Sequence, residues 1–528
     1  MRAALAARQD TDWRALDAER MRPYDRPALS MRLTSLDLAI IAAYLAGVTL
    51  FGIAFRQGQH TVRDYFLGGH TAPWWALAIS IVATETSTLT IIGTPALAFA
   101  GNITFLQLVL GYLVGRIVIV LVFLPHYFRR EYYTAYQLME RRFGPRVKAV
   151  AASTFLVTRA LAEGVRIAAI ALVVNAAFGT QQRTSVVLIM ALVLIYTFEG
   201  GMKAVIWTDV VQFILYFSGS IAAFFLLLHK IPGGWQAVAH AAAATNKFRV
   251  FDFSFSLVNP AKTYTFWSGV IGGGFLTMAS HGTDQTIVQR LLAAKSERES
   301  KIALLASGAI IFIQFALFLV LGVILYAWHG APAIQPGQSY DWVFPDFIVN
   351  AMPAGLRGIV IAAIFAVAMS NASGSLNSLA ASSVIDFQIL SGAQFPFEPA
   401  TVGAAIPGGT TPARFLRLSR WMTLFWGIVL IVLGTFQWGP MLEAGLTIAS
   451  ITLGSLLGLF LLAFLVPRAT ASGVLTGMFV GFAAILWIHF YTPLLWTWYV
   501  PAGAGITFLT GAIASVATSS ERPPVKIE

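Results

Sequence analysis

The chain has 528 residues, of which 57% are hydrophobic and only 11% are charged, and its mean hydropathy is +0.73. Soluble domains carry about 25% charged residues, so this composition excludes a water-soluble globular protein, a disordered chain and a coiled coil. The absence of cysteine excludes a disulfide scaffold and thiolate metal sites. A polytopic membrane protein remains. We therefore expect the net charge of +11 in cytoplasmic loops rather than on a nucleic-acid-binding surface.

The first 35 residues form a polar segment in which arginines alternate with acidic residues. It lacks the apolar core of a signal peptide, so we expect a solvated tail over 1–35. Met31 is an alternative start of the native chain, because the apolar pattern begins shortly after it.

Apolar runs then follow one another and predict about thirteen membrane-spanning helices. The runs lie at 36–55, 72–99, 104–125, 148–178, 184–198, 207–228, 264–282, 302–328, 355–386, 416–436, 441–466, 470–491 and 495–517. The connections alternate between basic segments, such as 129–148, 290–301 and 414–420, and segments almost free of lysine and arginine. By the positive-inside rule this alternation predicts a cytoplasmic C-terminus, including the tail 518–528, and an external N-terminus.

Two of these runs are interrupted. The run 72–99 carries Glu85 among hydroxyl residues and then Gly93 and Pro95, and the run 264–282 carries a glycine triplet at 272–274 and ends in a polar segment. Polar, irregular backbone at membrane depth is tolerated where it lines a cavity. Interrupted helices at corresponding positions of two halves are typical of inverted-repeat transporters. The pattern predicts repeats over 72–228 and 264–466, an extra helix at 36–55 and two further helices over 470–517.

Few ionisable residues lie inside the predicted spans, and they are the candidates for function. Glu85 with its hydroxyl neighbours suits a hard cation or a proton, although such a cluster also serves helix packing. Arg159, Glu163 and Arg166 recur at i, i+4 and i+7, a spacing that allows both arginines to pair with the one carboxylate. The triad has one positive charge in excess, which favours an anion or zwitterion nearby, and a purely structural ion-pair ladder is the alternative.

Three further features are less specific. Asp209 stands near the start of a span, where the helix dipole alone would stabilise it, and His281 in a polar segment suits either a proton relay or an interface. The segment 367–378 is dense in hydroxyls and amides, which favours close helix packing or cation ligation. The sequence contains no Walker A motif, zinc-type histidine spacing or nucleophile elbow, so ATP-driven transport, a transition metal and hydrolytic enzyme activity are not expected.

Six segments in order resemble the sodium:solute symporter family, whose members include sugar, proline, pantothenate, sialic-acid and monocarboxylate cotransporters. The segments are 64–69 (DYFLGG), 80–87 (SIVATETS), 134–144 (TAYQLMERRFG), 196–209 (YTFEGGMKAVIWTD), 283–295 (TDQTIVQRLLAAK) and 369–378 (MSNASGSLNS). The resemblance implies an all-α fold of the leucine-transporter type, with two inverted repeats of five helices.

The resemblance also implies a sodium site between the first broken helix and the eighth core helix. Its ligands map to the carbonyls of Ala83, Thr86 and Val367 and to the side chains at Ser370 and Asn371, with Asp209 close by. Family members usually carry serine or threonine at the position of Asn371, which leaves the ion and its stoichiometry open.

Ser280 stands where sugar-transporting members carry a gating tyrosine, and this departure argues against a sugar. We expect the solute near Glu85, Ser87 and Thr90 and near the second broken helix, around His281, with the arginines of the triad favouring a small carboxylate or zwitterion.

The sequence thus predicts a secondary symporter, not an enzyme, that imports a small organic solute with Na⁺ across a bilayer. We expect this symporter to work by alternating access in a bacterial inner membrane. Its expected partners are the solute, sodium and lipid, without nucleic acid or ATP, and its oligomeric state is open. Proton coupling through Glu85 and a transporter-like membrane sensor are the alternatives.

Overall fold

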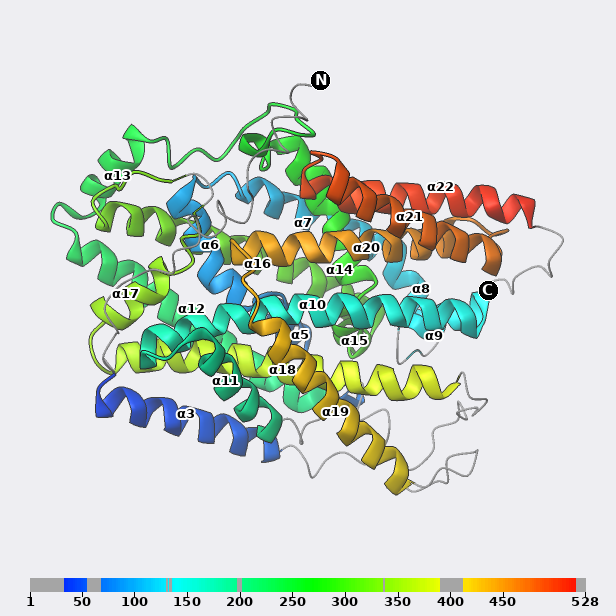
Figure 1. Ribbon diagram of the computed structural model, residues 1–528, viewed down its shortest axis with the longest axis horizontal. Coiled ribbons are helices and arrows are strands. Elements are labelled where there is room, and N and C mark those ends of the chain that lie inside the picture. The colour runs from blue at the N-terminus through cyan, green and yellow to red at the C-terminus, as the bar shows by residue number, and fades with distance from the viewer. Residues whose placement is uncertain are drawn as a thin grey trace, which may run out of the picture.

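Long helices with roughly parallel axes build the protein, as the computed structural model shows (Figure 1). The structure describes residues 33–54, 68–129, 132, 135–196, 202–335, 338–389 and 412–518. Within these ranges the regular elements are all helical. The N-terminal helix α3 packs against α18 at one edge of the molecule, and α21 and α22 pack together at the opposite edge.

The helices have the following bounds. They are α3 Ser35–Ala54, α5 Trp74–Glu85, α6 Thr88–Ala100, α7 Leu106–Val118, α8 Leu124–Phe128, α9 Ala135–Phe143, α10 Pro145–Phe178, α11 Gln182–Tyr196, α12 Met202–Lys230, α13 Gly234–Ala244, α14 Gly274–Gly282, α15 Gln285–Leu292, α16 Glu297–Trp328, α17 Val343–Ala351, α18 Leu356–Ile389, α19 Pro412–Gly434, α20 Met441–Leu465, α21 Ala471–Tyr491 and α22 Tyr499–Ala517. Two π-helical turns, η3 Ile119–Phe123 and η5 Ser268–Gly273, run directly into α8 and α14.

Among the described residues, eight helical segments are long and apolar enough to cross a membrane, and the pair α5–α6 makes a ninth. Each of the thirteen expected spans coincides with at least one helix, but α3, α11, α14 and α19 do not meet the same criterion over the described residues. The class of an all-helical membrane protein is therefore confirmed, whereas the number of thirteen crossings and the division into repeats stay predictions.

The first expected interruption is present. Helix α5 ends at Glu85, α6 begins at Thr88, and the two are bent by 65°. Thr86 and Ser87 between them have extended backbone conformations. The hydroxyl of Thr90 accepts a hydrogen bond from the Ser87 amide at 3.4 Å, as threonine and serine side chains do at helix starts. Hydroxyl residues that compete with the helical backbone thus accompany the break.

The second interrupted run was marked by two features, the glycine triplet Gly272–Gly274 and the polar segment at its end, and the break lies at the second. At the glycines the chain is helical and passes from η5 into α14. The break follows α14, at Thr283 and Asp284, and the Asp284 side chain accepts the amide of Thr286 at 2.8 Å to begin α15.

The glycines serve close packing instead of a break. A Cβ on Gly273 would lie 2.3 Å from the carbonyl oxygen of Leu108, and one on Gly111 would lie 2.2 Å from that of Gly269. Helices α7 and η5–α14 therefore touch backbone to backbone, which small residues permit between membrane helices.

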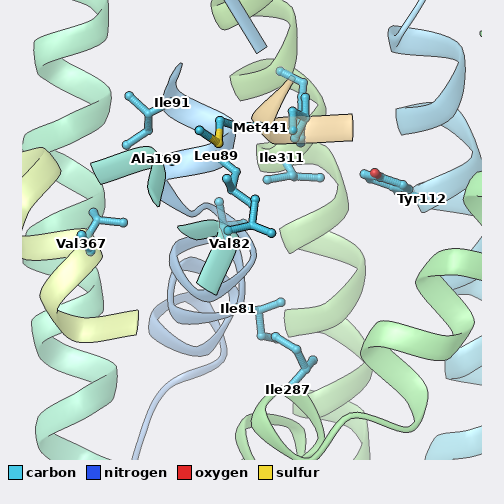
Figure 2. Packing of buried hydrophobic residues seen from close by; sticks show 14 of the residues in the cluster. Ile81, Val82, Leu89, Ile91, Tyr112, Ala169, Ile287, Ile311, Val367 and Met441 are labelled. Carbon is cyan, nitrogen blue, oxygen red and sulfur yellow. The ribbon is translucent and has the colours of Figure 1, made fainter. Parts of the chain in front are cut away.

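Apolar side chains fix the helices on both sides of the first break (Figure 2). Ile81 and Val82 come from α5, Leu89 and Ile91 come from α6, and Val367 comes from α18; all five are buried. The core thus holds the unwound segment close to α18, which is the arrangement on which the candidate site depends.

Candidate functional site

The break between α5 and α6 leaves backbone carbonyls without helical partners, because the last carbonyls of a helix have no following amide to bond. Helix α18 reaches this point: the Asn371 Nδ2 donates a hydrogen bond to the Thr86 carbonyl at 3.5 Å. Val367 precedes Asn371 by four residues and so shares its face of the helix. Ala83 and Val367 are both buried, and the side chain of Ser370 lies outside the described part of the chain.

The Thr86 side chain belongs to a hydrogen-bonded network that links the break to α16 and α12. Its hydroxyl accepts from the Gln314 amide at 2.7 Å, and the Gln314 carbonyl oxygen accepts from the Tyr216 hydroxyl at 2.9 Å. Gln314 and Tyr216 are buried on α16 and α12. Neither was expected from the sequence, since a single amide or phenol in a span carries little signal. These hydrogen bonds hold the side chain of Thr86 in place, while the Thr86 carbonyl faces α18.

Asp209 is compensated by a neighbouring arginine rather than by a helix dipole. Asp209 lies near the start of the span Val205–Lys230, as expected. However, α12 begins at Met202, about two turns before Asp209, so the residue lies beyond the first turn, where the helix dipole acts. The carboxylate accepts from Ser80 at 2.6 Å and from Arg290 at 3.0 Å, and Arg290 also donates to Ser80 at 2.9 Å. This buried cluster joins α5, α12 and α15 one turn before Ala83.

Glu85 forms a second buried charged cluster together with Arg116 and His281. It is ion-paired with Arg116, and the His281 Nε2 lies 3.3 Å from its carboxylate. Arg116 also donates to Ser307 at 3.2 Å, and the Ser280 hydroxyl lies 2.9 Å from His281 Nδ1. The Arg116 side chain has no exposed surface. The structure thus brings together the predicted residues Glu85, Ser280 and His281 around an arginine that was not predicted.

The pairing limits what Glu85 can do. Its charge is already balanced by Arg116, so it is not a spare counter-charge for a cation, and proton coupling through Glu85 loses its main support. The sequence did contain an indication of this pair, because Arg116 is a lone arginine inside the expected span 104–125. Buried charges in membranes are nearly always paired, so it needed an acidic partner.

The triad on α10 is only partly paired. Arg166 contacts the Glu163 carboxylate at 3.0 Å, but Arg159 donates to the Ser375 hydroxyl at 2.9 Å, and this hydroxyl lies 2.7 Å from Glu163. Of the two pairings that the spacing allows, the structure shows the one with Arg166, whereas Arg159 contacts Ser375. A glutamate N-terminal to its basic partner pairs better than one C-terminal to it, which favours the pair with Arg166. Ser375 of α18 lies between Arg159 and Glu163 and contacts both.

A small cavity lies beside this triad. Its volume is about 10 Å³, and its lining includes Thr88, Arg166 and Asn371, together with the apolar Ile167 and Ile170. Within the described residues the buried Arg166 Nε has no hydrogen-bond partner. The predicted solute-site residues Ser87 and Thr90 lie at the start of α6, next to Thr88. The cavity therefore joins the break, the charged triad and the α18 face that carries Asn371.

Over the same described ranges, no group of three or more histidine, aspartate and glutamate side chains is placed to hold a metal ion. The oxygen atoms at the break are instead carbonyls and amides, which are ligands for hard cations.

The sequence matches the sodium:solute symporter family over residues 65–481. It is 27% identical to the sodium/sialic acid symporter SiaT of Proteus mirabilis, over 91% of this chain and 95% of that protein. It is 28% identical to the mouse sodium-coupled monocarboxylate transporter 1, over 87% of this chain and 74% of the relative. The human sodium/iodide cotransporter is 27% identical, over 85% and 68% respectively.

Solved structures agree in fold. A Na⁺-coupled sialic acid symporter in its substrate-bound outward-open state superimposes with a TM-score of 0.78 at 26% identity, covering 93% of this chain and 99% of that one. The inward-facing transporter Mhp1 superimposes with a TM-score of 0.55 at 13% identity, over 85% of this chain and 91% of that one, which shows the fold alone. The expected leucine-transporter type of fold is confirmed, and the chain belongs to the sodium:solute symporter family of integral membrane transporters.

Proposed function

We propose that this protein imports a small organic carboxylate or zwitterion together with sodium by alternating access. The observation that carries the solute class is the excess positive charge beside the cavity. The triad holds two arginines and one carboxylate: Arg166 is ion-paired with Glu163, whereas Arg159 donates to the Ser375 hydroxyl. The Nε of Arg166 has no hydrogen-bond partner among the described residues. A partly buried guanidinium whose buried Nε is a spare donor favours a planar carboxylate.

The other residues that line the cavity favour a solute that also has a small apolar part. Ile167, Ile170 and Ile189 form apolar walls, whereas Thr88 and Asn371 supply polar groups. The cavity of about 10 Å³ has room for about one water molecule, so a solute enters only after a movement of the surrounding helices. Such a movement is what an alternating-access cycle requires at a site between α6, α10 and α18.

Sodium is expected at the break, among the carbonyls of Ala83, Thr86 and Val367 and the side chains of Ser370 and Asn371. Oxygen ligands of this kind suit a hard cation. The contact of Asn371 with the Thr86 carbonyl supports the proximity of α18 to the break. Asp209 is ion-paired with Arg290 and accepts a hydrogen bond from Ser80, one turn before Ala83. We therefore expect it to hold this part of α5 in place without contacting sodium.

The test is the thermal stability of purified protein in the presence of small carboxylates, amino acids and neutral sugars, each in sodium and in potassium. A ligand of the folded state at about 100 times its Kd stabilises that state by about 2.7 kcal/mol. We expect stabilisation by a carboxylate or amino acid that is larger in sodium. Equal stabilisation in potassium would refute the coupling, and stabilisation by sugars alone would refute the solute class.

The variant Arg166→Gln tests whether the stabilising carboxylate binds in the cavity. It is expected to abolish stabilisation by the carboxylate while the response to sodium alone persists. Arg183→Gln is the matched control, because Arg183 lies exposed at the start of α11 and lines no part of the cavity. If Arg166→Gln binds the carboxylate as the wild type does, the solute binds elsewhere.

A further inference from the structure

Asn371 takes part in both the break and the cavity. Its Nδ2 donates to the Thr86 carbonyl at 3.5 Å, and the same side chain lines the cavity together with Thr88 and Arg166. It therefore stands between the place where sodium is expected and the place where the solute is expected.

The carboxamide of Asn371 differs from a hydroxyl because its two ends have opposite hydrogen-bonding roles. The nitrogen only donates and the oxygen only accepts. A carbonyl such as that of Thr86 can accept the N–H or bind a cation, but a cation next to the carbonyl repels the partial positive charge of the N–H. Rotation of the amide about its last torsion exchanges the two ends, so the oxygen would face the cation and the N–H would face the cavity.

The backbone at this position is held by a hydrogen bond from α18 itself, whereas the side chain contacts the Thr86 carbonyl and lies beside the cavity. The Asn371 carbonyl accepts from the Ser375 hydroxyl at 2.7 Å. The Ser375 oxygen in turn lies 2.7 Å from the Glu163 carboxylate and 2.9 Å from the Arg159 Nε. The charged triad thus anchors this turn of α18, and rotation of one amide requires no displacement of the helix.

We propose that the Asn371 carboxamide is the coupling element between the two ligands. Without sodium, its N–H is engaged by the Thr86 carbonyl. Sodium takes that carbonyl and the amide oxygen, and the released N–H then donates to the carboxylate of the solute beside Arg166. This inference rests on the proposed function for the position of sodium and for the class of the solute, and the two experiments below test these two parts separately.

The first experiment titrates sodium alone, at constant ionic strength with choline chloride, and follows the thermal unfolding of the purified protein. In Asn371→Ser no amide competes for the Thr86 carbonyl, whereas the hydroxyl can still contact a cation. We expect the sodium midpoint to fall about fivefold, the equivalent of one net hydrogen bond of about 1 kcal/mol. A midpoint equal to or above that of the wild type overturns the competition between N–H and sodium.

The second experiment measures reciprocity. Sodium and solute must change each other's affinity by the same factor, commonly about 5- to 150-fold. We expect Asn371→Ser to bind the stabilising carboxylate but with a coupling factor close to one. A coupling factor equal to that of the wild type overturns the inference. If no carboxylate stabilises the wild type, the proposed solute class fails, and the sodium titration still decides the competition.

The controls separate coupling from folding. Asn175→Ser makes the same substitution on α10 at a residue that does not line the cavity, and it is expected to keep the wild-type midpoint and coupling. Asn371→Thr repeats the test with a second hydroxyl if the serine variant does not fold. If Asn175→Ser reproduces the effect of Asn371→Ser, the change is not specific to this site and the inference is overturned.

Discussion

Removal of Arg116 is the most direct test of the buried charges. The substitution Arg116→Met keeps an unbranched side chain of similar length but leaves the Glu85 carboxylate without its partner. It also removes the donor to the Ser307 hydroxyl, which lies on α16. Because the Arg116 side chain has no exposed surface and that of Glu85 is only 13% exposed, water cannot readily replace the lost partner.

The expected cost follows from the asymmetry of buried ion pairs. Breaking such a pair by removing one partner destabilises a protein by about 3–5 kcal/mol, whereas replacing both partners by neutral groups is often close to neutral. Arg116→Met and Glu85→Gln are therefore each expected to lower the midpoint of thermal unfolding clearly, and the double variant is expected to be more stable than Arg116→Met alone.

The measurement is a double-mutant cycle on purified protein in detergent, with thermal unfolding followed by intrinsic fluorescence. The exposed Arg183 supplies the control Arg183→Met, which is expected to change stability by less than about 0.5 kcal/mol. Contacting residues commonly show coupling energies of about 0.5–3 kcal/mol. Additive effects of Arg116→Met and Glu85→Gln would refute the pairing, as would wild-type stability of Arg116→Met.

Two further predictions concern packing and pH. Gly111→Ala places a Cβ 2.2 Å from the Gly269 carbonyl oxygen and is expected to cost about 1–3 kcal/mol, whereas Gly505→Ala has no atom within 4 Å of its new Cβ and should leave the unfolding temperature unchanged or slightly higher. In the connection after α13, burial lowers the pKa of the Lys247 ammonium to about 8. The unfolded chain binds more protons between that value and the ordinary lysine pKa of about 10.4, so this group makes stability rise with pH across that interval. Lys247→Met should reduce the rise in unfolding temperature between pH 7 and 9.5, and Lys262→Met should not; an unchanged pH profile in Lys247→Met would contradict the assignment.

Much of the fold could be predicted from the sequence, because each membrane crossing requires a long apolar run that is visible in the local sequence. Each helix that crosses a bilayer must be long and apolar, so the runs around 302–328 and 441–466 coincide with α16 and α20. The break at Thr86 and Ser87 was also readable, since a carboxylate and several hydroxyls stand together in one span. The second run was marked by the glycine triplet 272–274 and by the polar segment at its end, and only the polar segment coincides with a break. Glycine permits both a break and close helix packing, and here it serves the packing.

The site was predicted less completely than the fold. Ser87, Thr90, Glu163 and Arg166 were predicted from the sequence, and their role stays a prediction. The structure places Glu163 and Arg166 beside Thr88 and Asn371 at one cavity. The partners Gln314 and Ser375 were not identified as such, because a polar residue on a distant helix gives no indication in the sequence of the group that it contacts.

The sequence by itself determined the class of protein, the positions of its helices and the place where the first core helix unwinds, since all three depend on composition and order over a few tens of residues. The tertiary structure alone decided which buried charges meet. Arg116 and Glu85 are separated by 31 residues and Arg290 and Asp209 by 81, whereas spacing along one helix informs only about neighbours three or four residues apart. Pairing between helices depends on how the helices pack, and that is why the cavity and its charged walls emerge only in the folded molecule.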